Sequence, residues 1–512
     1  MKSVSLLNRL LNVGKNEWPR IVVAWSLQLF LRAGFVMGWT VTIAMFINRM
    51  GIETLPYLFV INALLVMLGT IIFSYLLKKI PHGLLIFYTT LMAIALLLLS
   101  TLFAYSNDIV FFGILILAQS ILIAQLHILI SLFTEDLFSP LESQRTFPLI
   151  ATSETIGGII GGLLVGTLSG FLPAYKFIYL WIIFISLIIP TLMTAHSYSK
   201  RTPSIRVHKH EKSKQKRGMA IPNLLKGIRK IRRVPFLQGI VLIVLLQFMM
   251  TYLFEFQYTK AIQEEVMAHE PPPISFEVRD YQPDSSLQVS LLDVNPIETN
   301  LAVAHQSETE MENKLTQKLG MLQVIFSAGS LLVQIFVTSR ILNSLGIIST
   351  LLIHPLLTLI NLVGMTLRFN FLSASIGRSN FEITTGIFRN TYHSSYYAIK
   401  ENMRDQMKEI MEGFVKPFGA ILAFGLLYLI QQAHSPQTET MIINTCMIGI
   451  AILMLLRSYK LHTDYTAISY QNIGNENDLP TRLNAIEILG QKGHEIKTEL
   501  LVKYLHNNKE TA

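Results

Sequence analysis

Long apolar stretches separated by short polar segments dominate the chain. Twelve are long enough, or nearly so, to cross a bilayer, and they lie near residues 20–47, 56–77, 83–105, 109–133, 146–172, 175–195, 234–258, 315–339, 346–369, 371–397, 410–431 and 441–456. About twenty apolar residues in a helix span a hydrocarbon core of about 30 Å. Because a backbone inside lipid must satisfy its own hydrogen bonds, the pattern predicts an all-α polytopic membrane protein with twelve transmembrane helices.

The composition supports this prediction and excludes other classes. Of the 512 residues, 51% are hydrophobic and only 15% are charged, against about 25% charged in an ordinary soluble domain. A single cysteine, Cys446, rules out an intrachain disulfide. The sequence contains no Gly-x-x-x-x-Gly-Lys-Ser/Thr phosphate loop, and His208 and His210 have no partners at metal-site spacing. We therefore expect neither an enzyme nor a cofactor.

The charges of the loops predict the orientation of the chain. Basic residues gather in alternate loops, which places both termini in the cytoplasm. The linker 196–233 has 13 Lys and Arg against one acid, whereas the insert 259–318 has 11 Asp and Glu against 4 Lys and Arg. We expect the linker inside, where it can meet anionic membrane lipids, and the insert outside. Aromatic residues do not alternate with the basic ones, so a nucleic-acid partner is not expected.

The cytoplasmic tail, residues 459–512, shows a second helical pattern. Apolar residues recur at helical spacing on both sides of Gly490 and Gly493, which predicts two short antiparallel helices similar to one HEAT-like repeat. One such pair cannot bury both of its faces alone. The tail and the acidic insert are therefore the expected places for a protein partner.

The chain also shows signs of an internal duplication. Glu142-Ser-Gln-Arg145 follows the fourth span, and Glu401-Asn-Met-Arg404 follows the tenth, 259 residues later. The glycine-rich fifth span matches the eleventh if a small gap is allowed, and we expect its glycines to serve close helix packing. The chain then divides into a six-helix bundle at 1–195, the linker 196–233, a second bundle at 234–458 and the tail. Two six-helix pseudo-repeats are the plan of major facilitator transporters.

Polar residues inside the spans identify a candidate site. An ionisable residue there costs about 2.5–3.5 kcal/mol or more, so it normally faces protein or water. The first, fourth, seventh and tenth spans, which line the central cavity in the major facilitator plan, carry such residues. The predicted substrate-binding residues are Arg32, Gln125, Gln247, Arg378, Glu382 and Arg389.

The tenth span is the most informative. Arg378, Glu382 and Arg389 follow one another on one helical face. Arg378 and Glu382 can pair at the i, i+4 spacing, which leaves Arg389 less compensated. With Arg32 across the cavity it would form a site for phosphate or carboxylate. The alternative is that these residues form ion pairs that hold the two halves together.

Other charged residues are candidates for gating or coupling. Glu154 in the fifth span and Lys416 in the eleventh occupy matching positions, so we expect them to pair where the halves rock. Glu255 lies near an outer end and could join an exterior gate. The full gating and coupling set is Glu154, Glu255, Lys416, Glu142, Arg145, Glu401 and Arg404. His127 and His354 are more typical of packing residues than of proton carriers.

Three stretches resemble a known family. They are the segment from Ala44 to Gly51, the segment Arg145-Thr-Phe-Pro-Leu-Ile150 followed by the glycines 157–162, and the segment from Arg389 to Gly419. These are similar to the ATP/ADP translocase (nucleotide transporter) family and its major-facilitator-like bacterial relatives, over roughly residues 20–456. The resemblance implies nucleotide exchange and, with the charge bias, a bacterial inner membrane.

The function favoured by these patterns is secondary transport of a small anionic metabolite by alternating access, with a nucleotide-like cargo if the resemblance holds. Two alternatives remain. One is export of another solute coupled to protonation of Glu255 or Glu382. The other is a membrane scaffold or sensor that does not transport and acts through the insert and the tail.

Overall fold

A computed structural model shows the chain as a bundle of long helices. It describes residues 17–473 apart from 78, 139, 202–230, 269–295, 400–406, 408–409 and 434–435, and it also describes Ala485. No strand occurs in this part of the chain. Ten of the described helices are long and apolar enough to cross a membrane. The chain is thus an all-α, multi-pass membrane protein, as predicted.

The first half of the chain forms one helical bundle. Its helices are α2 (Trp18–Met50), α3 (Leu55–Leu76), α4 (His82–Leu102), α5 (Asp108–Leu117), α6 (Ala124–Leu137), α7 (Pro140–Leu168), α8 (Phe177–Ser186) and α9 (Ile188–Arg201). A π-helical turn, Ala118–Ile123, joins α5 to α6, so the two form one crossing. Short 3₁₀ turns at Ile52–Thr54 and Ala174–Lys176 precede α3 and α8.

The second half forms a similar bundle. Its helices are α12 (Pro235–Ala268), α13 (Pro296–Val333), α14 (Ser339–Leu345), α15 (Ile347–Leu351), α16 (Ile353–Leu367), α17 (Phe371–Ser395), α19 (Lys416–Ala433) and α20 (Pro436–Ile473). π-helical turns at Gln334–Thr338 and Met411–Val415 lead into α14 and α19, and a 3₁₀ turn, Tyr396–Ala398, follows α17. The helices α13 and α17, in the places of the predicted eighth and tenth spans, are not among the ten apolar ones.

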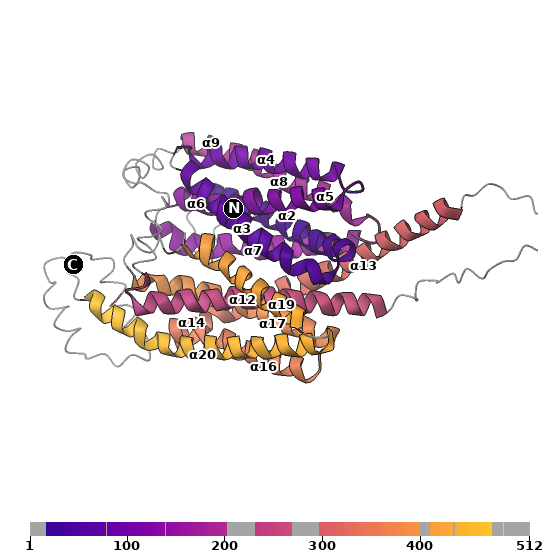
Figure 1. Ribbon diagram of the computed structural model, residues 1–512. Helices are drawn as coiled ribbons and strands as arrows, with labels where there is room; N and C mark the ends of the chain where they lie inside the picture. The colour runs from indigo at the N-terminus through magenta and orange to yellow at the C-terminus, as the bar shows by residue number, and fades with distance from the viewer. Residues whose placement is uncertain are drawn as a thin grey trace, which may run out of the picture.

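Two predicted boundaries differ from the structure. The helices α12 and α13 continue into the expected insert 259–318 and project beyond their neighbours (Figure 1). The helix α20 runs past the expected end of the second bundle at 458 into the tail, where Tyr465 packs on Phe236 with ring centroids 5.3 Å apart. Hydropathy fails at these ends because the helices bury charged residues there, such as Lys260 bonded to Glu439 at 3.0 Å.

The two halves repeat the same helix packing. The first helix of each half lies against the fifth and the sixth, so α2 contacts α7 and α8 as α12 contacts α19 and α20. Glycines allow the first and fifth helices of each half to approach closely. A Cβ atom added at Gly161 of α7 would lie 2.5 Å from the carbonyl oxygen of Ala33, and one added at Gly419 of α19 would lie 3.0 Å from that of Leu245. The correspondence of the fifth and eleventh spans is therefore seen in the packing.

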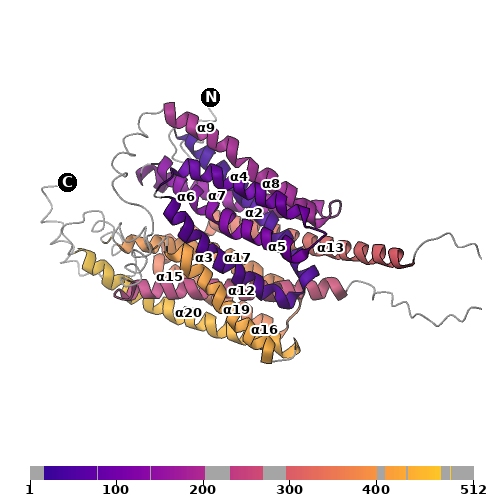
Figure 2. The ribbon, with the colours of Figure 1, turned by 45° about the horizontal axis from the view of Figure 1, so that its top comes forward.

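The halves meet along three main pairs of helices. The helices α7 and α2 both lie against α13, and α3 lies against α19 (Figure 2). Gly162 and Gly166 let α7 approach Gly320 of α13, where a Cβ atom at Gly162 would lie 2.9 Å from the Gly320 carbonyl oxygen. Gly413 packs on Thr70 of α3 in the same way. The glycine-rich spans thus serve packing, as expected, and do so between the halves as well as within them.

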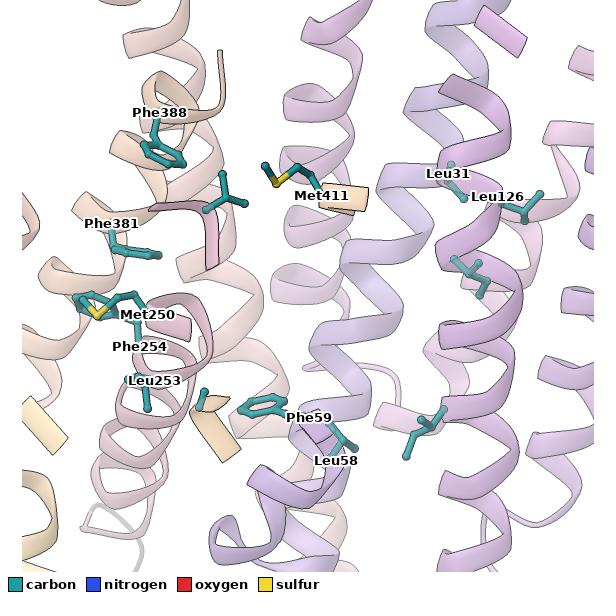
Figure 3. Close-up of a cluster of buried hydrophobic side chains, with 14 of the residues drawn as sticks. Leu31, Leu58, Phe59, Leu126, Met250, Leu253, Phe254, Phe381, Phe388 and Met411 are labelled. Atoms are coloured by element: carbon teal, nitrogen blue, oxygen red, sulfur yellow. The ribbon is translucent and has the colours of Figure 1, made fainter. Parts of the chain in front are cut away.

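Buried apolar side chains from both halves form one core. Phe254, Phe381 and Phe388 come from the second half, and Leu31 and Leu126 from the first (Figure 3). Burial of such side chains does not drive association inside lipid as it does in water, so close packing between the helices holds the two halves together.

The end of the bundle at Met50 and Asp108 is called the outer end and the opposite end the inner end, following the sides predicted from loop charge.

Candidate functional site

Ionisable side chains gather between the two bundles. They are Arg32 of α2, His127 of α6, Glu154 of α7, Glu255 of α12, Arg378, Glu382 and Arg389 of α17, Glu412 in the turn before α19, and Lys416 of α19. Each lies within a crossing, where charge is costly unless protein or water surrounds it. Seven of the predicted binding or gating residues are thereby brought together, namely Arg32, Glu154, Glu255, Arg378, Glu382, Arg389 and Lys416.

Arg378 joins two carboxylates near the outer end of this cluster. Its Nη1 donates to Glu382 at 2.7 Å, and its Nη2 and Nε donate to Glu255 at 3.0 and 3.1 Å. The i, i+4 pair predicted from sequence is present, and Glu255 adds a partner from α12. With two carboxylates on one guanidinium, Arg378 has little capacity left for an anionic ligand in this state.

Arg389 is less compensated. It lies three turns further along α17, and its side chain is 49% exposed although it faces the opposite half. Its Nη1 lies 3.5 Å from a carboxylate oxygen of Glu154 of α7, which is long for a charge-assisted hydrogen bond. Arg32 is half-buried and lies over the ring of Phe35 at 5.6 Å, close enough to interact electrostatically with Glu154, Glu382 and Arg389. Among the described residues Arg32 has no ion pair.

The expected pair between Glu154 and Lys416 is replaced by other contacts. Lys416 pairs with Glu412, one turn before it, and lies over the ring of Phe248 at 4.8 Å. Glu154 contacts Arg389 instead. The two expected partners remain within electrostatic range of each other and of His127, which is exposed although it lies inside a crossing. Both residues lie where the halves meet, but each holds a different partner.

The two predicted glutamines do not face the site. Gln125 is 2% exposed and donates to Thr70 of α3 at 3.1 Å. Gln247 is 1% exposed, donates to Thr385 at 2.9 Å and accepts a hydrogen bond from the ring of His354. The ring of His354 also bonds to the hydroxyl of Thr384. These amides satisfy buried polar groups between helices, so their assignment to substrate binding is corrected, and His354 is a packing residue as predicted.

The outer end of the cluster is closed. Arg49 of α2 bonds to Glu312 of α13 at 2.6 Å and to Asp108 at 3.0 Å, and Asn313 accepts from the amide of Ala174 at 3.0 Å. Beneath these bonds lies an apolar seal of α2, α12 and α13 residues, which consists of Ile43, Ala44, Ile47, Tyr258, Ile262, Val266, Met311, Leu315, Leu319 and Phe326. Arg389 of α17 and His127 of α6, which lie further toward the inner end, have exposed side chains in contrast.

A small pocket lies between the seal and the charge cluster. It is lined by Trp39, Thr40, Ile43, Glu255, Tyr258, Leu319, Gln323, Phe326 and Arg378. Most of these residues have no charge and lie on helices far apart in the chain, so sequence reasoning did not single them out. The same is true of Arg49 and Glu312, which are 263 residues apart.

Two of the remaining predicted residues, Glu142 and Arg145, fall at the inner end of α7. Glu142 bonds to Arg20 at 2.9 Å and joins α7 to α2 within one half. Arg145 lies in α7, and its side chain is outside the described part of the structure. Glu401, Arg404, the basic linker and the HEAT-like tail, except Ala485, also lie outside the described residues.

Comparisons with known proteins agree with the fold. No protein-family model and no curated protein matches the chain. Among solved structures, the nucleoside transporter NupG is similar, with a TM-score of 0.57, 11% identity and coverage of 86% of this chain and 99% of the other. A bacterial homologue of the iron transporter ferroportin in an outward-facing state gives a TM-score of 0.55, 13% identity, and coverage of 87% and 99%. At these identities the likeness shows a major-facilitator-like fold.

Proposed function

We propose that the protein is a secondary transporter that carries a small anionic solute by alternating access. The observation that carries this proposal is the arrangement of Arg32 and Arg389. Both guanidinium groups lie between the halves, neither is held by a close ion pair among the described residues, and the exposed side chains of the cluster lie toward the inner end, away from the closed outer end. A channel would need a path open at both ends, whereas a carrier needs one closed end at a time.

The charge balance of the cluster explains how binding and release could occur. Glu154 holds Arg389 loosely, so an anionic solute that enters from the inner end can replace Glu154 on the guanidinium. Planar guanidinium groups bind phosphate and carboxylate through paired hydrogen bonds. When the solute leaves, Glu154 returns to Arg389. This exchange keeps Arg389 paired in both the empty and the loaded transporter.

The chemical class of the solute is inferred from the family resemblance and from the contacts of the carboxylates. The resemblance to nucleotide transporters favours a nucleotide, and one of the structures with a similar fold is described as a nucleoside transporter. Glu255 and Glu382, the residues of the proton-coupled alternative, both bond to Arg378. Both carboxylates are thus already engaged by one guanidinium in this state. We therefore place anion exchange before proton coupling.

Transport assays in proteoliposomes test the proposal. Purified full-length protein is assayed for counterflow of ADP, inorganic phosphate and citrate, with neutral adenosine as the comparison. Arg389→Gln should abolish uptake of the anion that the native protein carries, and Arg389→Lys should retain part of it. Arg340→Gln is the matched control, because Arg340 is an exposed arginine at the inner end of the same half. Uptake of adenosine alone, or equal uptake by Arg389→Gln, would refute the proposal, and uptake driven by an imposed pH gradient would favour the proton-coupled alternative.

A further inference from the structure

The pocket at the closed end of the charge cluster is lined by oxygen atoms that lack hydrogen-bond partners. Thr40 of α2 and Tyr258 of α12 are 8% and 4% exposed, and neither hydroxyl has a hydrogen bond within the described part of the chain. Oε1 of Glu255 has none there either, because both bonds to Arg378 use Oε2. Gln323 donates through its amide nitrogen to a serine of its own helix, which leaves its amide oxygen unengaged. Oxygen ligands from three helices thus line one pocket.

The size of the pocket limits what it can hold. Its volume is about 30 Å³, and a water molecule needs a cavity of roughly 10–15 Å³. The pocket therefore has room for one small ion and a water molecule, but not for an organic molecule.

The charge beside the pocket favours a cation. Glu255 and Glu382 share the single guanidinium of Arg378, so these three side chains carry one net negative charge. Net charge inside a crossing is costly, and a cation bound at the unengaged oxygen of Glu255 would neutralise it. Hard cations take oxygen ligands, but Ca²⁺ needs about six to eight of them and Mg²⁺ keeps several waters, for which the pocket has no room. A monovalent ion fits best.

The charge balance of the whole cluster links this cation to the anion. The ionised side chains that the structure places between the halves balance one another, with Arg32, Arg378, Arg389 and Lys416 against Glu154, Glu255, Glu382 and Glu412. An anion on Arg32 and Arg389 adds negative charge, which a cation in the pocket offsets. Glu382 connects the two places, since it accepts from Arg378 and lies within electrostatic range of Arg32 and Arg389.

We propose that the pocket of Thr40, Glu255, Tyr258 and Gln323 is a site for a small monovalent cation, Na⁺, which binds together with the transported anion. The link to the anion rests on the proposed function, whereas the cation site itself does not. Exchange of one anion for another would then move the cation in both directions, and net uptake of the anion would follow a sodium gradient.

Binding of radiolabelled Na⁺ to the purified full-length protein, with N-methylglucamine as the other cation, tests the site. Binding should be saturable. Thr40→Val and Tyr258→Phe each remove one hydroxyl and nearly keep the side-chain shape, so each should weaken binding at least roughly ten-fold, whereas Thr40→Ser should retain most of it. Thr42→Val is the matched control, because the hydroxyl of Thr42 is buried on the same helix and bonded to the carbonyl of Gly38 at 2.7 Å. Absence of saturable binding, or binding that either hydroxyl variant leaves unchanged, would refute the site.

A second measurement tests the link and keeps the two proposals apart. Na⁺ should tighten binding of the anion identified by counterflow at least about five-fold, and Thr40→Val should lose this dependence. Arg389→Gln should lose the anion but still bind Na⁺. If Na⁺ binds in the pocket and no anion is carried, the cation site stands and the proposed function falls. Anion uptake that follows a pH gradient without Na⁺ would assign Glu255 to a proton and refute the cation site.

Discussion

Neutralising Glu312 should open the outer end of the transporter. Glu312 accepts from Arg49 at 2.6 and 3.3 Å, its side chain is only 7% exposed, and the contact joins α13 of one half to α2 of the other. Asp108 and the carbonyl of Ala104 also bind Arg49, but both belong to the same half as Arg49. Glu312→Gln keeps the shape of the side chain and removes the charge that crosses between the halves.

The size of the effect follows from the geometry. A hydrogen bond to a charged group contributes about 1.5–3 kcal/mol. Taking about 2 kcal/mol for the contact between the halves, and 1.4 kcal/mol for each factor of ten, the population with an open outer end should rise about thirty-fold. The apolar seal beneath the contact remains, so the closed state should still be populated.

Cysteine labelling measures this population. In a Cys446→Ser background, Ile47→Cys places a thiol in the seal, where the native side chain is 1% exposed. Its rate of reaction with a maleimide in detergent should rise by about the same factor in Glu312→Gln. Glu310→Gln is the control, because the side chain of Glu310 is 64% exposed and pairs with Lys314 within the same helix, α13. Equal labelling rates in Glu312→Gln and Glu310→Gln would refute the reasoning.

Three further changes test the roles assigned to other residues. Gly162→Leu should lower the thermal unfolding midpoint and reduce transport, because its side chain would collide with the backbone of α13; an unchanged midpoint would contradict the packing role. Gln247→Leu should lower the thermal unfolding midpoint, because it removes a hydrogen-bond partner of the buried His354. The folded variant should bind the transported anion as tightly as the native protein does. Glu154→Gln should tighten binding of that anion, since Glu154 no longer competes for Arg389, and slow its exchange; weaker binding would show that Glu154 supports the site.

The sequence predicted the crossings and part of the charge cluster because both depend on local patterns. Apolar runs identify spans, and the spacing of Arg378 and Glu382 on one helix suffices to predict their ion pair. The ends of the crossings were harder to place. Hydropathy falls where α12, α13 and α20 carry charged residues, yet tertiary contacts such as Lys260 with Glu439 keep these residues within the helices.

The errors at the site have one physical origin. Whether a polar side chain faces a cavity or another helix depends on partners that lie far away in the sequence. Gln125 is held by Thr70 and Gln247 by His354, and neither contact has a local signal. The contact of Arg49 with Glu312 was missed for the same reason, since Glu312 lies in a segment that the sequence indicated to be a loop.

Distances between spin labels at the two ends of the bundle test the central claim most directly. One label pair, Lys79→Cys with Arg340→Cys, spans the halves at the inner end, and another, Glu53→Cys with Arg368→Cys, spans them at the outer end; all four native side chains are exposed. Each pair is measured in the Cys446→Ser background with and without Glu312→Gln. If the halves rock about the buried charges, Glu312→Gln should lengthen the outer distance and shorten the inner one. Two distances that lengthen together, or an outer distance that changes alone, would contradict alternating access.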